Sequence, residues 1–152
     1  MEDQFKLLNK NIMQFFQQGD ITKARDEYER LISYQTQKVT DNPESYKEKA
    51  RLGSSLAIIT YIDDQLAVDK KLLLLGEGIS LFEDIMSKTG DNLEPEQQLL
   101  FCDLLDFRGR TLYNNRIFDS AIEDFNEAIK LYRGLKVNLK PRIKAKLPIL
   151  YV

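Results

Sequence analysis

The sequence predicts an all-α fold, built from antiparallel helical hairpins. Apolar residues recur at spacings of three and four along most of the chain, which is the period of an amphipathic helix. Glycine, asparagine and proline interrupt this pattern at intervals, and no run before the last dozen residues alternates as a strand does. With 152 residues, of which 43% are hydrophobic and 30% charged, the chain is long enough for one domain with a core.

The first two predicted helices are separated by Gly19 and Asp20. The first is expected over residues 3–17, because its apolar side chains fall on one face. Glycine suits a left-handed helix exit and aspartate caps the next start. The second helix has apolar spacings of 3, 4, 3 and 1 along Ile21, Ala24, Tyr28, Leu31 and Ile32.

The third and fourth helices form the middle of the chain. Asn42 as cap and Pro43 at the first helical position predict the start of the third helix, which extends to about residue 62. The fourth is expected over 66–88 and contains Gly76 and Gly78. Two glycines inside a helix cost about 1 kcal/mol each relative to alanine. We therefore expect one long helix in which a neighbouring backbone packs closely, in preference to a break.

The last two helices have the clearest boundaries. Pro95 opens the fifth helix, which carries Leu99, Gly109 and Leu112 along its length. The sixth is predicted over 118–133, with acidic residues early and basic residues late, as the helix dipole favours. Its apolar stripe is nearly continuous: Phe118, Ala121, Ile122, Phe125, Ala128, Ile129 and Tyr132.

The second helix of each predicted hairpin repeats one pattern. A small residue is followed four positions later by an aromatic residue, and three positions after that by an aliphatic or small residue. The three instances are Ala24-Tyr28-Leu31, Gly78-Phe82-Ile85 and Ala121-Phe125-Ala128. A small side chain lets two helices approach closely, and the aromatic ring one turn later fills the groove beside it.

This pattern resembles that of the tetratricopeptide repeat family. In the third hairpin, the glycine, aromatic and alanine positions of the family are matched by Gly109, Phe118, Ala121, Phe125 and Ala128. Leu52-Gly53 looks like the Leu-Gly pair of the family. The small residues are 54 and 43 positions apart, more than the 34 of the family, and Ile12 replaces the glycine of the first hairpin. The resemblance implies a divergent, short right-handed solenoid of about six helices, over residues 1–134.

The resemblance also implies a concave groove, lined by the first helix of each hairpin. The groove residues would be Lys6, Asn9, Met13 and Phe16 from the first hairpin, and Asp103, Asp106, Arg110, Tyr113 and Asn114 from the third. Asp106 has the wrong charge for the carboxylate clamp of chaperone-binding members. The expected function is a non-enzymatic adaptor, scaffold or assembly subunit that binds a peptide or helix of a partner protein.

The residues that most often do chemistry are rare in this chain. It has no histidine, which is the usual general base and the commonest metal ligand. The single cysteine, Cys102, lies among leucines and is predicted to be a core residue. Asp63 and Asp64 are interpreted as a solvated turn, and Asp103, Asp106 and Arg110 as a surface ion network. No catalytic residue, cofactor or metal is expected. One cysteine, no apolar N-terminal leader and no long apolar run suggest the cytoplasm, with the nucleus as an alternative.

The end of the chain, residues 135–152, differs in charge from the rest. No acidic residue follows Glu127, whereas seven basic residues do, which leaves 15 basic against 24 acidic residues before them. The segment also carries an apolar strip, which favours a role in capping the fold. Binding of a partner or a second copy is one alternative. Another is contact with nucleic acid or a membrane surface, made by Lys136, Lys140, Arg142, Lys144 and Lys146.

Overall fold

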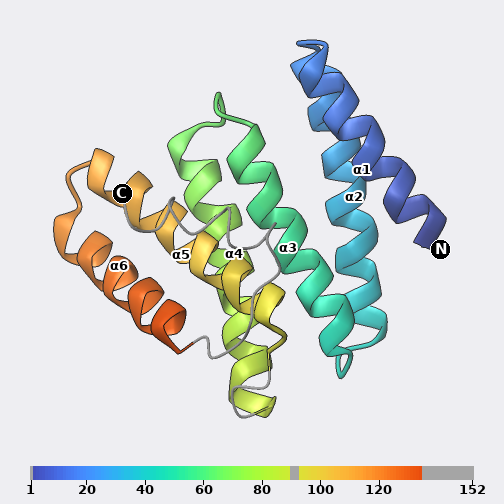
Figure 1. Cartoon of the computed structure of the whole chain (residues 1–152). Helices are drawn as coiled ribbons and strands as arrows, with labels where there is room; N and C mark the ends of the chain where they lie inside the picture. Colours follow the sequence, from blue (N-terminus) through green and yellow to red (C-terminus); the bar gives the residue numbers. More distant parts are fainter. Residues whose placement is uncertain (1, 90–92, 135–152) are drawn as a thin grey trace.

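The computed structural model describes residues 2–89 and 93–134, and the described residues form six α-helices joined by turns, without a strand (Figure 1). The helices are α1 (Glu2–Gln17), α2 (Ile21–Asp41), α3 (Tyr46–Ile62), α4 (Val68–Thr89), α5 (Pro95–Asn114) and α6 (Phe118–Arg133). The all-α prediction is thus confirmed. The predicted bounds of the sixth helix agree with those of α6.

The turn between α1 and α2 is built as the sequence predicts. Gly19 has a φ of 76°, the left-handed region that glycine enters without steric cost. Asp20 caps α2, and its carboxylate accepts a hydrogen bond of 3.2 Å from the backbone N–H of Lys23.

The predicted start of α3 at Asn42-Pro43 is wrong. Asn42 instead ends α2, because its backbone N–H and its side-chain amide both donate to the carbonyl of Lys38. The cap of α3 is Ser45, whose hydroxyl accepts a 3.3 Å hydrogen bond from the N–H of Glu48. Both residues are good helix caps, and only the end of α2 decides between them.

The fourth helix is continuous through both glycines, as predicted. A Cβ atom on Gly78 would lie 3.0 Å from Leu104 Cδ2 and 3.6 Å from the backbone oxygen of Gly53, so α3 and α5 both approach this point. Nothing lies within 4 Å of the corresponding position at Gly76. Close packing is therefore confirmed at Gly78, and the expectation was wrong for Gly76.

Glycines that face aromatic rings hold two of the hairpins together. Added Cβ atoms on Gly53 and Gly109 would lie 2.7 Å from Phe82 Cε2 and Phe125 Cε1, respectively. In the first hairpin Ile12 takes the glycine position, and it packs in the same core cluster as Tyr28. Phe82 and Phe125, the aromatic residues of the repeated pattern, thus make real helix contacts, in which each ring meets a glycine on the first helix of its own hairpin.

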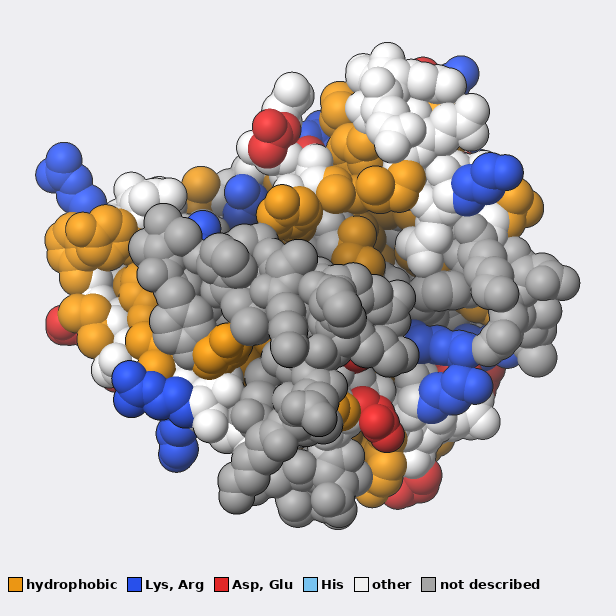
Figure 2. Space-filling model, in the orientation of Figure 1, with side chains coloured by type: hydrophobic (Ala, Val, Ile, Leu, Met, Phe, Trp, Pro, Cys, Tyr) orange, Lys and Arg blue, Asp and Glu red, His pale blue; other side chains and the backbone are white. Residues whose placement is uncertain are grey.

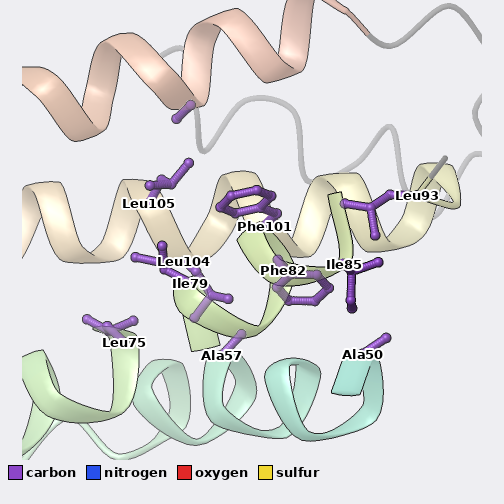
Figure 3. Packing of buried hydrophobic residues seen from close by; sticks show 11 residues of the cluster. Ala50, Ala57, Leu75, Ile79, Phe82, Ile85, Leu93, Phe101, Leu104 and Leu105 are labelled. Carbon is purple, nitrogen blue, oxygen red and sulfur yellow. The ribbon is translucent and has the colours of Figure 1, made fainter. Parts of the chain in front are cut away.

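The hydrophobic core consists of two clusters. The larger spans α3 to α6, and Figure 3 shows Phe82 and Ile85 of α4 packed between Ala50 of α3 and Phe101 of α5. The rings of Phe82 and Phe101 stack with centroids 5.7 Å apart. The second cluster joins α1 and α2 to α3 and α4 through Leu8, Ile12, Tyr28, Leu31, Leu52, Leu56, Ile59 and Leu74.

The three hairpins follow one another across the molecule, from α1/α2 to α5/α6 (Figure 1). Each helix packs mainly on its neighbours in the chain, and α3 also packs on α5. The first helices of the second and third hairpins therefore touch directly.

Candidate partner-binding surface

The predicted residues of α5 lie on one face of the helix. Arg110 Nε is 3.1 Å from each carboxylate oxygen of Asp106, so these two residues form an ion pair at the predicted position. The Arg110 side chain is exposed, whereas Asp103 and Asp106 are buried, with 7% and 5% of their surface accessible. The predicted surface network is therefore half buried.

Asp106 is incompletely satisfied in this setting. Its Oδ2 atom is buried and accepts no hydrogen bond from the described residues, although Arg110 lies close to it. Burial raises the pKa of the Asp106 carboxyl above its usual value, and the charge of Arg110 opposes that rise only in part.

The distal part of the same helix is aromatic and exposed. Tyr113 is 54% exposed, and its ring packs edge-on against Phe118, with centroids 5.2 Å apart. Asn114, the last residue of α5, is also exposed. These two predicted residues lie at the tip of the third hairpin, next to its turn.

The predicted residues of α1 form a second, separate group. Met13 is exposed, Asn9 is half-buried, and Phe16 packs against the core cluster that contains Tyr28. Lys6 lies within α1, and its side chain is outside the described part of the structure. Because α3 lies between α1 and α5 in Figure 1, the predicted residues of α1 and those of α5 are not in contact with each other.

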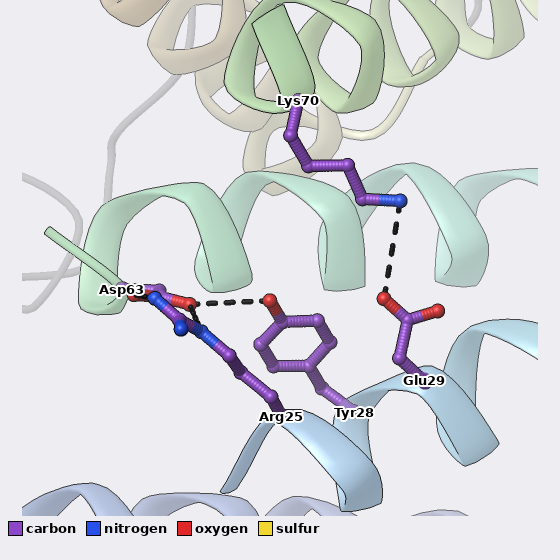
Figure 4. Close-up of polar contacts among 5 residues, drawn as sticks. All are labelled: Arg25, Tyr28, Glu29, Asp63 and Lys70. Carbon is purple, nitrogen blue, oxygen red and sulfur yellow. Dashed lines mark hydrogen bonds and ion pairs between the residues drawn. The ribbon is translucent and has the colours of Figure 1, made fainter. Parts of the chain in front are cut away.

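A buried polar cluster, which the sequence did not reveal, ties α2 to the end of α3 (Figure 4). Arg25 Nε and Nη2 donate to Asp63 Oδ2 and Oδ1 at 2.8 and 3.0 Å, and the Tyr28 hydroxyl donates to Oδ2 at 3.1 Å. Asp63 is only 1% exposed, so its interpretation as part of a solvated turn was wrong; the exposed Asp64 fits that interpretation. No spacing in the sequence links Arg25 with Asp63, because 38 residues separate them.

These contacts fix the charge state of the cluster. Burial raises the pKa of the Asp63 carboxyl, but the hydrogen bonds from Arg25 and Tyr28 lower it more, so the net pKa is below the usual 3.8. Burial and the neighbouring Asp63 carboxylate raise the pKa of Tyr28 to about 12. Asp63 is consequently a fixed anion at neutral pH with all its partners in place, which suits structural bracing.

Ion pairs also join the two helices within the second and the third hairpin. Arg108 of α5 binds Asp124 of α6 through two hydrogen bonds of 2.8 Å. Lys49 of α3 pairs with Asp84 of α4. Each pair joins the two helices of one hairpin, next to the glycine and ring contacts described above.

A groove of about 750 Å³ runs beside α4 and is lined by residues of α2, α3, α4 and α5. Leu72, Leu73 and Leu81 provide much of its apolar wall, and Asp84 and Arg108 lie along its rim. Both charged rim residues already have a partner within the fold. The sequence did not predict this groove, because it depends on how α2, α3, α4 and α5 pack on one another.

Cys102 is fully buried, which agrees with its prediction as a core residue. Its thiol donates weakly to the carbonyl of Ala128, with a distance of 3.6 Å from sulfur to oxygen. Burial raises the pKa of this thiol to about 12, so the reactive thiolate form is suppressed.

Neither a metal nor a membrane site emerges from residues 2–89 and 93–134. No three histidine, cysteine or carboxylate side chains in this part are grouped so that they could hold a metal ion. None of its helices is long and apolar enough to cross a membrane. Lys136, Lys140, Arg142, Lys144 and Lys146 lie outside the described residues, and their predicted contact with nucleic acid stays a prediction.

On the face shown in Figure 2, hydrophobic side chains reach the surface in several places, interspersed with basic and acidic ones. Compared with models of protein families, with curated proteins and with solved structures, the chain matches none.

Proposed function

We propose that this chain is a non-enzymatic protein-interaction module, which holds a peptide or helix of a partner protein on the side formed by α1, α3 and α5. The proposal rests mainly on where large apolar side chains are exposed. Met13 on α1, Tyr61 on α3 and Tyr113 on α5 are 41%, 63% and 54% exposed. Methionine and tyrosine are among the residues enriched at the centres of protein interfaces.

The polar groups of this side support recognition rather than catalysis. Tyr61 stacks on Phe107 of α5, with ring centroids 5.6 Å apart, so its ring is held in place while most of its surface is exposed. A rigid aromatic side chain loses little conformational entropy on binding. Arg110 adds a charged group to the same helix face as Tyr113. Together these side chains offer anchors for an apolar segment with a nearby acid.

The resemblance to tetratricopeptide repeats supports the same side. In that family the first helices of the hairpins line the binding groove, and here the direct packing of α3 on α5 agrees with such stacking. Three ion pairs are formed within the fold, each between its own two partners: Arg25–Asp63, Arg108–Asp124 and Lys49–Asp84. They are better suited to bracing the hairpins than to acid–base chemistry.

The test is partner capture with matched surface variants. The full chain is used as bait in extract of its own organism, the bound protein is identified after crosslinking, and its affinity is then measured with purified components. We expect Tyr61→Ala and Tyr113→Ala each to weaken binding about tenfold or more, the loss of a hot-spot side chain.

Ile122→Ala is the matched control, because Ile122 is as exposed as Tyr113, at 53%, but lies on α6. Its affinity should equal that of the unchanged chain. Loss of binding with Ile122→Ala and retention with both tyrosine variants would place the partner on the opposite side and refute the proposal.

A further inference from the structure

We propose that two copies of this chain associate through α6, with the two α6 helices antiparallel about a two-fold axis. The contact is made by the outer stripe of α6, which consists of Phe118, Ile122, Phe125 and Ile129. The inference goes beyond the proposed function, because it concerns a different face of the molecule and a second copy of the same chain.

The first argument is that the outer stripe is exposed where its counterpart in α4 is buried. The repeated pattern of small, aromatic and aliphatic residues aligns Phe118 and Ile122 of α6 with Leu75 and Ile79 of α4. Leu75 and Ile79 are 0% and 2% exposed, because they pack in one core cluster with α5, as Figure 3 shows for Ile79 and Leu104. Phe118 and Ile122 are 46% and 53% exposed. No described helix follows α6 to cover them as α5 covers α4.

The second argument is the spacing of the stripe. Its four residues are separated by 4, 3 and 4 positions, the spacing at which two helices pack along each other through interlocking side chains. The side of α6 that faces α5 is a different one, which carries the buried Ala121, Asp124 and Ala128. Phe125 serves both sides, because one edge of its ring contacts Gly109 and the side chain is only half-buried. The shape of the outer stripe therefore fits a helix.

The third argument is charge, which favours a second α6 as that helix. Asp119, Asn126 and Arg133 follow one another at intervals of seven residues, so they lie along one edge of the outer stripe, and all three are exposed. In an antiparallel pair of identical helices, the same edges meet in opposite order. Asp119 of each copy then faces Arg133 of the other, and the two Asn126 side chains meet near the axis. Neither Asp119 nor Arg133 has an ion-pair partner among the described residues.

The same register joins apolar side chains and opposes the parallel arrangement. It brings Phe125 of each copy opposite Ile129 of the other, so the centre of the contact is apolar. A parallel pair would instead place the two acidic helix starts, with Asp119 and Glu123, at the same end. Since α6 has 16 residues and a length of about 24 Å, the contact is small, and the dimer should be weak and concentration-dependent.

The proposal is tested by sedimentation equilibrium of the purified full chain over a range of concentrations. We expect a monomer–dimer equilibrium, and Ile122→Lys should weaken dimerisation about tenfold or more, because it places a charge in the apolar contact. Leu73→Lys is the matched control, since Leu73 is 55% exposed but lies on α4, and this variant should dimerise like the unchanged chain. A chain that stays monomeric up to about 1 mM, or equal losses at both sites, would overturn the proposal.

Charge exchange tests the antiparallel register. Asp119→Arg and Arg133→Asp each place like charges opposite each other, so each variant alone should dimerise about fivefold more weakly than the unchanged chain. In an equimolar mixture, one copy of each variant restores two oppositely charged contacts, and the mixed dimer should form about as strongly as the dimer of the unchanged chain. Any effect on the stability of α6 itself is present in each variant alone as well as in the mixture. A mixture that dimerises no more strongly than its components would contradict the register.

Crosslinking locates the two-fold axis. Cys102 is buried, so a cysteine introduced on the surface of α6 provides the accessible thiol. Asn126→Cys should give a covalent dimer with a short bismaleimide, because the two copies of residue 126 lie near the axis. Ser120→Cys is the control, since Ser120 is also exposed on α6 but faces away from the outer stripe. Equal yields of covalent dimer at the two positions would contradict the proposed axis.

These outcomes are separate from those of the proposed function. Dimerisation is measured with the purified chain alone, so it is found or not found whether or not a partner protein is captured. Tyr61→Ala should weaken partner binding and leave the dimer intact, and Ile122→Lys should do the reverse, because the two residues lie on different helices, α3 and α6.

Discussion

Gly53 and Gly109 each face the ring of a phenylalanine so closely that a methyl group would overlap it. In contrast, Gly76 lies in the same kind of helix with open space beside it. The three positions therefore separate the two roles that a helical glycine can have, close packing and mere tolerance.

Gly109→Ala is expected to destabilise the fold by about 1–3 kcal/mol, because the new methyl group would lie 2.7 Å from the Phe125 ring and force it to move. Gly76→Ala is the matched control and should stabilise it by up to about 1 kcal/mol through helix propensity. Urea unfolding of the purified proteins measures both. Equal changes at the two sites would contradict the packing described here.

Asp63→Asn should destabilise the fold by about 1–3 kcal/mol at neutral pH, because the half-exposed Arg25 and the buried Tyr28 hydroxyl lose their ionic acceptor. The native pKa of Asp63 is lowered, so its stabilisation is present above the unfolded-state pKa and is lost as pH falls through the native value. The difference between the variant and the unchanged chain should therefore shrink below about pH 4. Asp64→Asn, at the exposed neighbour, should change stability by less than about 0.5 kcal/mol at any pH.

Cys102 should resist thiol reagents in the native protein at pH 8. Burial and its raised pKa, about 12, both suppress the thiolate. Since it is the single cysteine of the chain, the rate of labelling should follow the fraction of unfolded molecules across a urea titration. Rapid labelling without denaturant would contradict its burial.

At the scale of elements, the sequence predicted helices best where several local signals agree. Pro95 begins α5, and Gln97 accepts from the N–H of Glu94 at 3.2 Å, a partner that lies only three residues away. The stripe of α6 gave its bounds directly. The start of α3 was missed because Asn42 and Ser45 are equally good caps, and the choice depends on how far α2 extends.

Phe82→Ala should lower the free energy of unfolding by about 3–5 kcal/mol, because this fully buried ring joins α3, α4 and α5 and its loss leaves a cavity. Phe125→Ala should lower the free energy of unfolding by less, since Phe125 is partly exposed and its removal also relieves the close contact with Gly109. Chemical denaturation, with unchanged m-values as the check on two-state unfolding, compares the two. The reverse order would show that the third hairpin, rather than the second, is the centre of the core.

At the scale of the whole molecule, much less could be predicted. The groove beside α4 and the Arg25–Asp63 bond depend on how hairpins pack on each other, and residues 38 positions apart leave no periodic trace in one sequence. The candidate surface was predicted from a family resemblance, which named Tyr113 and Arg110 but not Tyr61. The position of Tyr61 on this surface follows only from the structure, in which its ring stacks on Phe107 of α5.

The two hydrophobic clusters meet on α3 and α4, and this arrangement has a consequence for how the protein aggregates after partial unfolding. Among the described residues, the smaller cluster attaches α1 and α2 to the rest of the fold, together with the Arg25–Asp63 pair, the exposed Lys70–Glu29 contact and a 3.5 Å hydrogen bond from the Gln35 amide to the carbonyl of Arg51 (Figure 4). Detachment of that hairpin would expose Leu52, Leu56 and Ile59 of α3 together. The remaining helices would then carry an exposed apolar surface that favours aggregation. Proteolytic cleavage near residues 42–45 should thus cause aggregation rather than release a smaller, stably folded fragment.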